Sequence, residues 1–381
     1  MEYGKGDVDI KYSFRKKFEG EEVRKGKERM VACFTGKGIP LVIKLQYTLR
    51  CWRSIFLFFF WEASSKRKCC IILGVVIICR MGWHELSWIG RVLLLMQLVH
   101  GVFSWGKYGH YAVCKIAEGY LSEDAMATVK KLLPDSAKGE LASVCSWPDN
   151  IKWYYNWHWT SSLHYVDTPN FKCNYKYYRD CYDSSGHRNN CVTGAIFNYT
   201  NQLFSAYQGY NPMLNYNLTE ALLFLAHYMA DVHQPLHVGF IGDLGGTSIK
   251  VGWYRRKTNL HHVWDTLIID TAVKTLYGSD VSAMVEAIQR NIRDAWSNDR
   301  SSWESCIYNN TVCPNLYASE SVRFACKFAY RNVTPGTTLQ DDYFLSRLPV
   351  VEKRLAQGGI RLAAVLNRLF SFQVKIRRTS R

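Results

Sequence analysis

The sequence predicts an all-α fold from residue 105 onward, as one mainly helical domain with a small β-hairpin and disulfide cross-links. Three observations support this prediction. Apolar residues recur at helical spacing through most of this region, with helix start and stop signals at suitable positions. One glycine-rich stretch is followed by alternating apolar and polar residues, which indicates a hairpin. Eight cysteines follow Trp105, and an even number in a secreted chain indicates disulfides.

The first predicted helix covers 123–133, because Ser122 is a good N-cap residue and Pro134 ends the apolar pattern. Three further segments have amphipathic helical spacing: 220–234, opened by Thr219 and ended by Pro235, then 280–296 and 341–370. The exception is 238–256, where the glycine-rich turn and the alternation predict the hairpin. No repeat or low-complexity linker interrupts this region, so we expect one domain.

Residues 1–104 do not read like the region that follows them. Residues 1–53 are mixed polar and basic, and the two apolar runs that follow, SIFLFFFW and CCIILGVVIIC, are each too short to span a bilayer. From Met81, a short polar start containing Arg91 leads into an apolar core and then to compact residues before Trp105, which is the layout of a secretory signal peptide. We therefore expect an upstream extension outside the mature protein at 1–80, a signal peptide at 81–104, the functional domain at 105–371 and a basic tail at 372–381. A membrane-anchoring leader is the alternative.

Cysteines and glycosylation motifs also indicate the secretory pathway. The eight cysteines are Cys114, Cys145, Cys173, Cys181, Cys191, Cys306, Cys313 and Cys326. Cys181 with Cys191, and Cys306 with Cys313, would close natural short loops, while the other pairings remain open. Four glycosylation sequons are present, at Asn198, Asn217, Asn309 and Asn332.

The net charge of +16 is weak support for a nucleic-acid partner. Residues 1–104 contain 18 basic and 9 acidic side chains, which leaves +7 for the rest of the chain. Four of the remaining basic residues lie in the tail at 372–381. Charge of this kind can attract anionic partners in general, so a functional site has to identify the partner.

Two pairs of histidine and aspartate stand four residues apart, His227 with Asp231 and His261 with Asp265. This spacing places both members of a pair on one face of a helix. Imidazole nitrogen and carboxylate oxygen are ligands that zinc takes in proteins. Further side chains of these types are His237, Asp149 in SWPDNI and His164 in LHYVD. Together they predict a zinc site.

Each of these features also has an ordinary structural interpretation. A helical His/Asp pair can be an ion pair or a hydrogen-bonded core histidine, and Asp149 can begin a turn after Pro148. Three other histidines have no spacing that requires a ligand role, namely His158, His233 and His262. Four tryptophans are expected to be core or surface aromatics rather than base-stacking groups: Trp147, Trp153, Trp157 and Trp159.

Six motifs in order resemble those of the plant bifunctional nucleases and the related fungal zinc-dependent single-strand nucleases. They are WGKYGH, SWPDNIKW, LHYVDTP, LLFLAHYMADVHQPLHVGF, GDLGG and RRKTNLHHVWD. The resemblance extends from 105 to about 371 and includes the eight cysteines. It implies a helical fold shared with bacterial zinc phospholipase C, with three zinc ions in a cleft. The implied activity is endonucleolytic hydrolysis of single-stranded DNA and RNA to 5′-phosphate products, by a protein we expect to be a monomer without a membrane partner.

Carried over residue by residue, the resemblance implies three ligand sets. The first zinc takes Asp149, His164, His227 and Asp231. The second takes His110 with the amino group and carbonyl of Trp105, and Asp231 bridges it to the first. The third takes His237, His261 and Asp265. Trp105 would then be the first residue of the mature protein, because an amide nitrogen has no lone pair for a metal whereas a free amine does.

The resemblance also implies roles in the reaction. A water held by the first two zincs would attack the phosphodiester, with Asp149 orienting it and taking its proton. The third zinc would stabilise the departing 3′ oxygen, and Lys152 would offset charge on the phosphoryl oxygens, unless it is a solvated surface lysine. Tyr165 would stack on an unpaired base, unless it is a core tyrosine. Thr247 stands where the family has Asn, which puts hydrogen bonds near the hairpin in doubt but removes no metal ligand.

Two other functions compete with this one. A zinc phospholipase would share the fold and most ligands, although Asp265 replaces the Glu expected of the bacterial phospholipases and the RRKTNLHHVWD motif is intact. A secreted zinc-binding glycoprotein without catalysis is the second alternative, kept open by the unusual leader and by Thr247.

Overall fold

The computed structural model describes residues 31–34, 40–43, 105–208, 215–306 and 311–371. The chain divides into two compact units, Met1–His100 and Gly101–Arg381. In the first unit, strands β1 (Val31–Phe34) and β2 (Pro40–Ile43) pair in antiparallel fashion. Apart from these strands, the expected upstream extension lies outside the described residues, as do the signal peptide at 81–104, the tail at 372–381 and the sequon at Asn309. The domain boundaries stay predictions.

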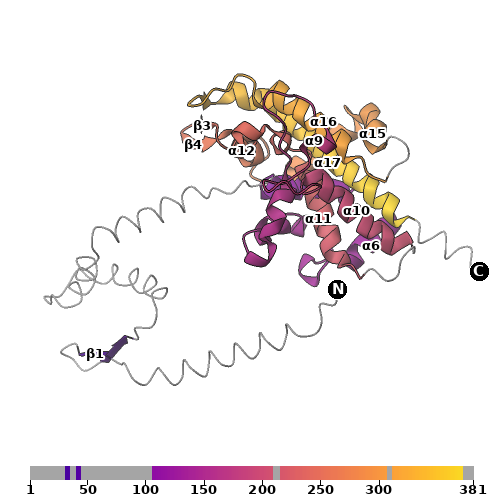
Figure 1. Ribbon diagram of the computed structural model, residues 1–381, viewed down its shortest axis with the longest axis horizontal. Helices are drawn as coiled ribbons and strands as arrows, with labels where there is room; N and C mark the ends of the chain where they lie inside the picture. The colour runs from indigo at the N-terminus through magenta and orange to yellow at the C-terminus, as the bar shows by residue number, and fades with distance from the viewer. Residues whose placement is uncertain (1–30, 35–39, 44–104, 209–214, 307–310, 372–381) are drawn as a thin grey trace, which may run out of the picture. The chain divides into compact units, whose positions relative to one another are not determined.

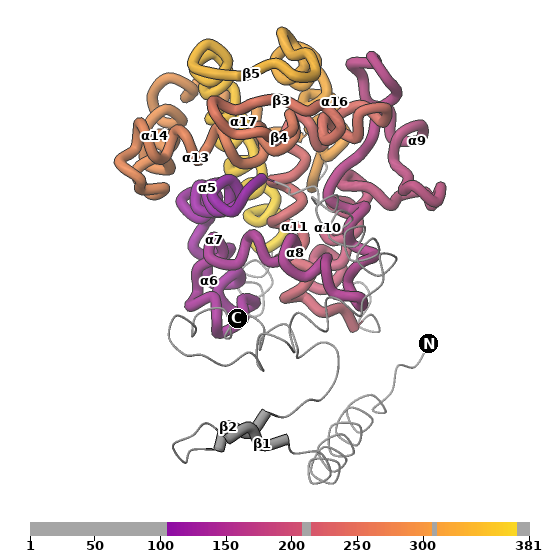
Figure 2. The backbone as a smooth tube through the Cα atoms, turned by 90° about the vertical axis from the view of Figure 1, so that its left-hand side faces the viewer, coloured from indigo at the N-terminus to yellow at the C-terminus, as the bar shows by residue number. Residues whose placement is uncertain are grey.

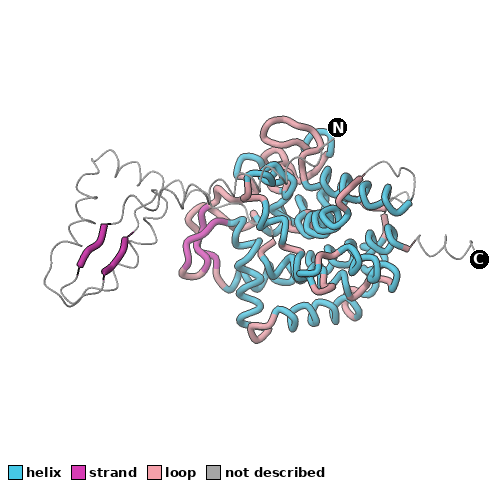
Figure 3. Tube along the Cα trace, turned by 90° about the horizontal axis from the view of Figure 1, so that it is seen from below, coloured by secondary structure: helices cyan, strands magenta, loops and turns pink. Residues whose placement is uncertain are grey.

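The second unit is built mainly of helices, which confirms the predicted fold class (Figure 1 and Figure 3). In chain order its elements are α5 (Lys107–Glu118), α6 (Glu123–Leu132), η1 (Asp135–Ala137), α7 (Leu141–Val144), α8 (Trp147–Ile151), η2 (Tyr155–His164), α9 (Tyr177–Asp180), α10 (Val192–Gln208), α11 (Leu218–Asp231), η3 (Pro235–Val238), η4 (Ile241–Asp243), β3 (Lys250–Trp253), β4 (Arg256–Asn259), α12 (Leu260–His262), η5 (Val263–Leu267), α13 (Ile268–Leu276), α14 (Val281–Arg293), α15 (Ser297–Glu304), α16 (Pro314–Phe324), η7 (Ala325–Ala329), β5 (Thr338–Leu339) and α17 (Asp341–Phe370).

Helices α11 and α17 form the centre of this unit. Every residue of α11 from Ala221 to Asp231 is buried, as expected of a helix that neighbours surround on all sides. Helix α17 is 30 residues long and packs against α5 and α11 (Figure 2). Polar side chains on α11 therefore face protein rather than water.

The helix boundaries largely follow the predicted signals. The Ser122 hydroxyl accepts a hydrogen bond from the Ala125 amide at 3.3 Å and caps α6 as expected. The prediction that Thr219 opens the next helix was wrong, because the Asn217 side chain caps α11 by accepting from the Glu220 amide at 3.1 Å. The Thr219 hydroxyl instead donates to the Leu132 carbonyl at 2.6 Å.

Helix α11 also ends earlier than predicted, at Asp231 rather than at Gln234. Gln234 has an extended backbone, the conformation favoured for a residue that precedes proline. The chain thus turns between Asp231 and Pro235 and brings His237 back toward α11.

The predicted hairpin is present, but it begins later in the sequence. Strand β3 pairs antiparallel with β4, with Lys250 opposite Asn259, and pairs parallel with β5 along its other edge. The preceding stretch forms η4 and a left-handed turn at 244–246, where Gly245 has a φ of +60°. A Cβ atom at Gly245 would lie 2.5 Å from the Leu236 carbonyl oxygen, so this position requires glycine.

Four disulfides cross-link the unit. Cys181–Cys191 and Cys306–Cys313 are the two short loops expected from the sequence, and the other pairs are Cys114–Cys145 and Cys173–Cys326. The sequon residues Asn198, Asn217 and Asn332 are all exposed, so a glycan could be attached at each without disturbing the core. Within the described residues, no helix combines the length and the apolar character needed to cross a membrane.

Candidate metal centre

Eight buried histidine and aspartate side chains meet between α5, α8, α11 and the segments that follow them. The least buried of the eight, Asp149, is only 8% exposed. Burying so many ionisable groups is costly unless they are paired or bind a metal. The eight residues are His110 (α5), Asp149 (α8), His164 (η2), His227 and Asp231 (α11), His237 (η3), His261 (α12) and Asp265 (η5).

They form three groups in which one potential ligand atom from each residue lies within 4.8 Å of the others. The groups are His110 with Asp149 and His227, His164 with His227 and Asp231, and His237 with His261 and Asp265. Such spacing suits an ion with ligand bonds of about 2.0–2.2 Å. The structure thus brings together all eight histidine and aspartate side chains that the sequence nominated.

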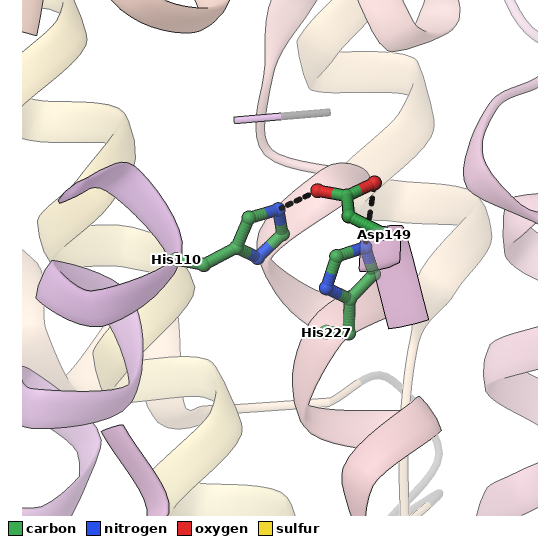
Figure 4. Close-up of side chains that lie close together, drawn as sticks. All are labelled: His110, Asp149 and His227. Atoms are coloured by element: carbon green, nitrogen blue, oxygen red, sulfur yellow. Dashed lines mark ion pairs between the residues drawn. The ribbon is translucent and has the colours of Figure 1, made fainter. Parts of the chain in front are cut away.

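The first two groups share side chains. His227 Nε2 lies 3.7 Å from Asp149 Oδ1 and 3.2 Å from Asp231 Oδ2. His110 Nε2 lies 3.7 Å from Asp149 Oδ2, and its ring stacks on that of His227 with 3.8 Å between centroids (Figure 4). His164 Nδ1 lies 3.0 Å from Asp231 Oδ2. Two adjacent ion positions therefore fit this cluster.

The third group lies at the other end of the Asp231–Pro235 turn. The Nε2 atoms of His237 and His261 are buried and face the Asp265 carboxylate at 3.4 Å and 3.0 Å. Neither nitrogen has an aligned hydrogen bond in the part of the chain that the structure describes. Two buried imidazole nitrogens and a carboxylate that converge in this way form a suitable set of metal ligands.

Backbone carbonyls fix the orientation of three of these imidazoles. Nδ1 of His227 lies 2.8 Å from the Cys145 carbonyl oxygen, and Nδ1 of His261 lies 2.6 Å from that of Gly245. Nδ1 of His237 lies 2.7 Å from the carbonyl oxygen of His164. A carbonyl oxygen can only accept, so each Nδ1 donates its proton and the Nε2 lone pair is left for a metal, as in most histidine–metal sites.

The three carboxylates are held in their ionised form. Burial alone would raise the pKa of Asp231, but His227, His237 and the other imidazoles around it outweigh that effect and hold its pKa well below the ordinary value. Burial would also raise the pKa of Asp265, but His261 and His237 outweigh burial and lower this pKa to about 2. The pKa of Asp149 is lowered against the effect of burial, chiefly by Lys152. A buried cluster with three such charges attracts cations.

Lys152 is buried and belongs to this cluster. Its Nζ lies 2.8 Å from Asp149 Oδ1, and only 4% of the residue is exposed. The alternative of a solvated surface lysine is therefore wrong. The sequence could not decide this, because the position of Lys152 one helical turn after Asp149 fits both interpretations.

Tyr165 directly follows His164 and is half-buried. Burial and the neighbouring Asp167 raise the pKa of its phenol, so it stays neutral. Thr247 has a buried hydroxyl with no hydrogen-bond partner among the described residues, whereas its amide donates to the Leu244 carbonyl at 3.2 Å. The turn is therefore kept with Thr247 in place of the expected Asn.

Trp105 lies at the junction of these elements. Its side chain is completely buried and the indole Nε1 donates to the Ala230 carbonyl at 2.9 Å, one residue before Asp231. The amide of Gly106 donates to the Asp265 carbonyl at 2.7 Å. Residue 105 is thus held beside the segments that carry both carboxylates.

One polar side chain at the centre was missed by sequence reasoning. Gln234 Nε2 donates to Asp265 Oδ1 at 2.5 Å, and its Oε1 accepts from the Leu236 amide at 2.5 Å. Its place immediately before Pro235 was the available signal, because the turn aims its side chain inward. The preceding residue, His233, places its Nε2 atom 2.9 Å from Arg361 Nη1. His233 therefore has a structural role, as expected.

Comparison with known proteins places these residues among nucleases. The S1/P1 Nuclease family model matches residues 105–371. Endonuclease 4 of Arabidopsis thaliana is 64% identical over 289 residues, an alignment that covers 76% of this chain and 97% of the relative. Endonuclease 2 of the same plant is 52% identical, with 76% and 98% covered. Nuclease S1 of Aspergillus oryzae is 31% identical over 291 residues, with 73% and 95% covered.

Proposed function

Since this chain belongs to the S1/P1 nuclease family and is an endonuclease, we propose that it cleaves single-stranded DNA and RNA with three zinc ions and leaves 5′-phosphate products. The observation that carries the proposal is the buried cluster of five histidines and three aspartates. The family assignment favours a nuclease over the phospholipase and over a non-catalytic glycoprotein. The four disulfides fit passage through the secretory pathway, and we expect a monomer that is delivered to the apoplast or the vacuole.

The ligand assignment keeps the third group, combines Asp149 with the second group, and places His110 with Asp231, whose Oδ1 lies 3.4 Å from His110 Nε2, and with Trp105 as an addition. Asp149, His164, His227 and Asp231 would hold the first zinc, and His237, His261 and Asp265 the third. His110 and Asp231 would hold the second with the free amino group and carbonyl of Trp105. The contact between Gly106 and Asp265 and the burial of Trp105 support this addition, because they hold residue 105 beside the cluster.

Zinc at these positions would activate a water molecule for attack on phosphorus and would offset the charge of the phosphodiester. Asp149 is ionised and near the middle of the cluster, so its carboxylate can orient the attacking water and accept its proton. Lys152, held 2.8 Å from Asp149, brings a positive charge to the place where the phosphoryl oxygens gain negative charge.

Tyr165 would select unpaired nucleotides. It is adjacent to the ligand His164 and only half-buried, so part of its ring remains accessible to a base. A base can stack on an aromatic ring only when it is not enclosed within a duplex. This placement supports a preference for single strands.

Removal of zinc tests the proposal. The purified protein should contain close to three zinc ions and lose cleavage of a single-stranded DNA oligonucleotide on exhaustive chelation, and added zinc should restore both. A choline phospholipid, tested in parallel, should not be hydrolysed. Full nuclease activity in protein shown to be zinc-free by elemental analysis would contradict the proposal.

A further inference from the structure

The segment 153–163 begins and ends at the metal centre. Lys152, immediately before it, places Nζ 2.8 Å from Asp149 Oδ1. His164, immediately after it, places Nδ1 3.6 Å from the same oxygen. The intervening residues therefore form a projection whose two ends are fixed at one carboxylate.

This projection exposes four aromatic side chains, which we call the aromatic surface: Trp153, Tyr154, Tyr155 and Trp159. Their exposed fractions are 45%, 67%, 95% and 55%. Leaving rings of this size in water forfeits the free energy of burying them. Four exposed rings within residues 153–159 are therefore a candidate binding surface. The expectation of core or surface aromatics is confirmed for all four tryptophans, since Trp147 and Trp157 are half-buried and Trp153 and Trp159 are exposed.

Packing contacts of the neighbouring residues Trp157, His158 and Thr160 hold the backbone of the aromatic surface in place. The half-buried ring of Trp157 lies edge-on to Trp147 at 5.7 Å and is 5.9 Å from Phe224 of α11, measured between centroids. The Thr160 hydroxyl donates to the Trp157 carbonyl at 2.7 Å. His158 Nδ1 lies 3.2 Å from the Lys152 carbonyl oxygen. The exposed rings are thus held on a fixed support, which lowers the ordering cost of binding.

The chemistry of the projection suits nucleic acid. Residues 153–163 contain no aspartate or glutamate that would repel phosphates. The Lys152 ammonium lies 5.8 Å from the centroid of the Trp153 ring. Tyr155 is three residues from Lys152, so their Cα atoms are separated by at most about 11 Å. Aromatic rings beside a positive charge are the usual platform for single strands, because every base offers a face for stacking.

We propose that the aromatic surface stacks bases of the substrate strand that lie beyond the two nucleotides flanking the cleaved bond. The inference rests on the proposed function, because it takes a single strand as the occupant of the metal centre. The surface begins at Trp153, whose ring centroid lies 5.8 Å from the Lys152 Nζ atom, and that atom lies 2.8 Å from Asp149 Oδ1 in the centre. The aromatic surface favours long single strands over dinucleotides, and over duplexes, whose bases already stack on each other.

The test compares a dinucleotide with a 20-nucleotide single strand as substrates. The double variant Tyr155→Ala/Trp159→Ala should lower kcat/KM for the long strand at least about fivefold, the smallest effect expected for one lost stack. For the dinucleotide it should lower kcat/KM less than twofold. Tyr178→Ala is the matched control, because Tyr178 is 91% exposed and lies on α9. Tyr165→Ala should impair both substrates alike, because its stack lies at the cleaved bond.

Binding by zinc-free protein supplies a second measurement. In the presence of chelator, a fluorescent oligothymidylate should bind the wild type and Tyr178→Ala equally and the double variant at least about fivefold more weakly. The inference would be overturned if the double variant lost kcat/KM equally on both substrates. It would also be overturned if the variant kept the wild-type rate and affinity for the long strand. Binding to neutral lipid vesicles is measured in parallel. Loss of vesicle binding in the double variant, with unchanged affinity for the oligothymidylate, would also overturn the inference.

These outcomes separate the inference from the proposed function. If the wild type cleaves both substrates and the double variant keeps their ratio of kcat/KM, only the inference fails. If the wild type cleaves neither, the proposed function fails, and the binding measurement on zinc-free protein still decides whether the aromatic surface holds a strand.

Discussion

Asp231 connects two of the ligand groups through a single carboxylate. Its Oδ1 lies 3.4 Å from His110 Nε2, while its Oδ2 lies 3.0 Å from His164 Nδ1 and 3.2 Å from His227 Nε2. The side chain has no exposed surface. A group in this position can bridge two ions only while both of its oxygens carry negative charge.

We therefore expect Asp231→Asn to be the most damaging single change among the ligands. An amide bridges two cations poorly, so zinc content should fall by at least one ion and the single-strand cleavage rate by at least about hundredfold, since even outer partners of metal ligands contribute 10–100-fold. His261→Ala is the comparison, and it should lose only the third zinc. Elemental analysis and initial rates measure both, and near-normal values for Asp231→Asn would refute the ligand assignment.

The backbone nitrogen of Trp105 gives a second prediction at this scale. A protein that starts at Trp105 should be fully active, whereas one that retains Ser104 should lose one zinc and most of its rate, because an amide cannot replace the amine as a ligand. Helicity should not change, since the helices and disulfides are untouched. Forms starting at Trp105, Ser104 and Met81 can be compared for zinc content and strand cleavage. Equal results for all three would make Trp105 an ordinary internal residue.

Among the elements, α16 and α17 brace the turn that follows α11. Glu320 of α16 pairs with Arg354 at 3.0 Å and with Arg361 at 2.6 Å, both on α17. Arg354 Nε also donates to the His233 carbonyl at 3.0 Å, within the turn that leads to His237. Both arginines are buried, so the Glu320 carboxylate compensates charge that water cannot reach.

Glu320→Gln should lower the free energy of unfolding by about 3–5 kcal/mol at pH 6.5, the usual effect of breaking a buried ion pair. Burial opposes ionisation of Glu320, but Arg361 and Arg354 outweigh it and lower its pKa below the ordinary 4.5. This stabilisation is therefore complete above pH 4.5 and is lost as the pH falls through the lowered pKa of the folded state. The difference between wild type and variant should shrink as the solution becomes more acidic.

Denaturant unfolding of zinc-free protein at pH 6.5 and at pH 3.5 measures this difference without a contribution from metal loss. Glu286→Gln is the control, because Glu286 is exposed and its nearest arginine nitrogen is 3.9 Å away. That control should show little change at either pH. If the loss of unfolding free energy in Glu320→Gln were larger at pH 3.5 than at pH 6.5, the proposed role of the Glu320 ion pairs would be contradicted.

Elements with local signals could be predicted from sequence, and those that depend on distant segments could not. Ser122 and Pro134 delimit α6 by their own chemistry, so that helix was predicted almost to the residue. Thr219 is predicted as the start of α11, but the Asn217 side chain caps the helix. Both residue types are good caps, and the contact of Thr219 with the distant Leu132 carbonyl is not visible in the sequence. Strand β5 has two residues and exists only because β3 offers it an edge.

The candidate site shows the same division. Spacing nominated the His/Asp pairs of α11 and of the α12–η5 segment, because four residues make one helical turn. The resemblance added His110 and Trp105, which have no partner nearby in the sequence. Neither source could show that Lys152 is buried, that Gln234 contacts Asp265 or that the aromatic surface is exposed. Those properties depend on packing between segments far apart in the chain.

For the molecule as a whole, the proposed metal centre joins segments that span much of the second unit. The ligands come from residues 105 to 265, and the Cys114–Cys145 disulfide ties α5, which carries His110, to the segment before Asp149. The Cys145 carbonyl in turn fixes the orientation of His227. Binding of ions there would therefore stabilise the folded state as well as supply the reaction.

Anomalous diffraction from native crystals at the zinc absorption edge would locate these ions directly. We expect three peaks: one among Asp149, His164, His227 and Asp231, one between His110, Asp231 and the amino group of Trp105, and one among His237, His261 and Asp265. Each should disappear when data are collected on the low-energy side of the edge. A map with no peak at the Asp231 cluster, from crystals of protein that cleaves single strands, would contradict the proposed mechanism.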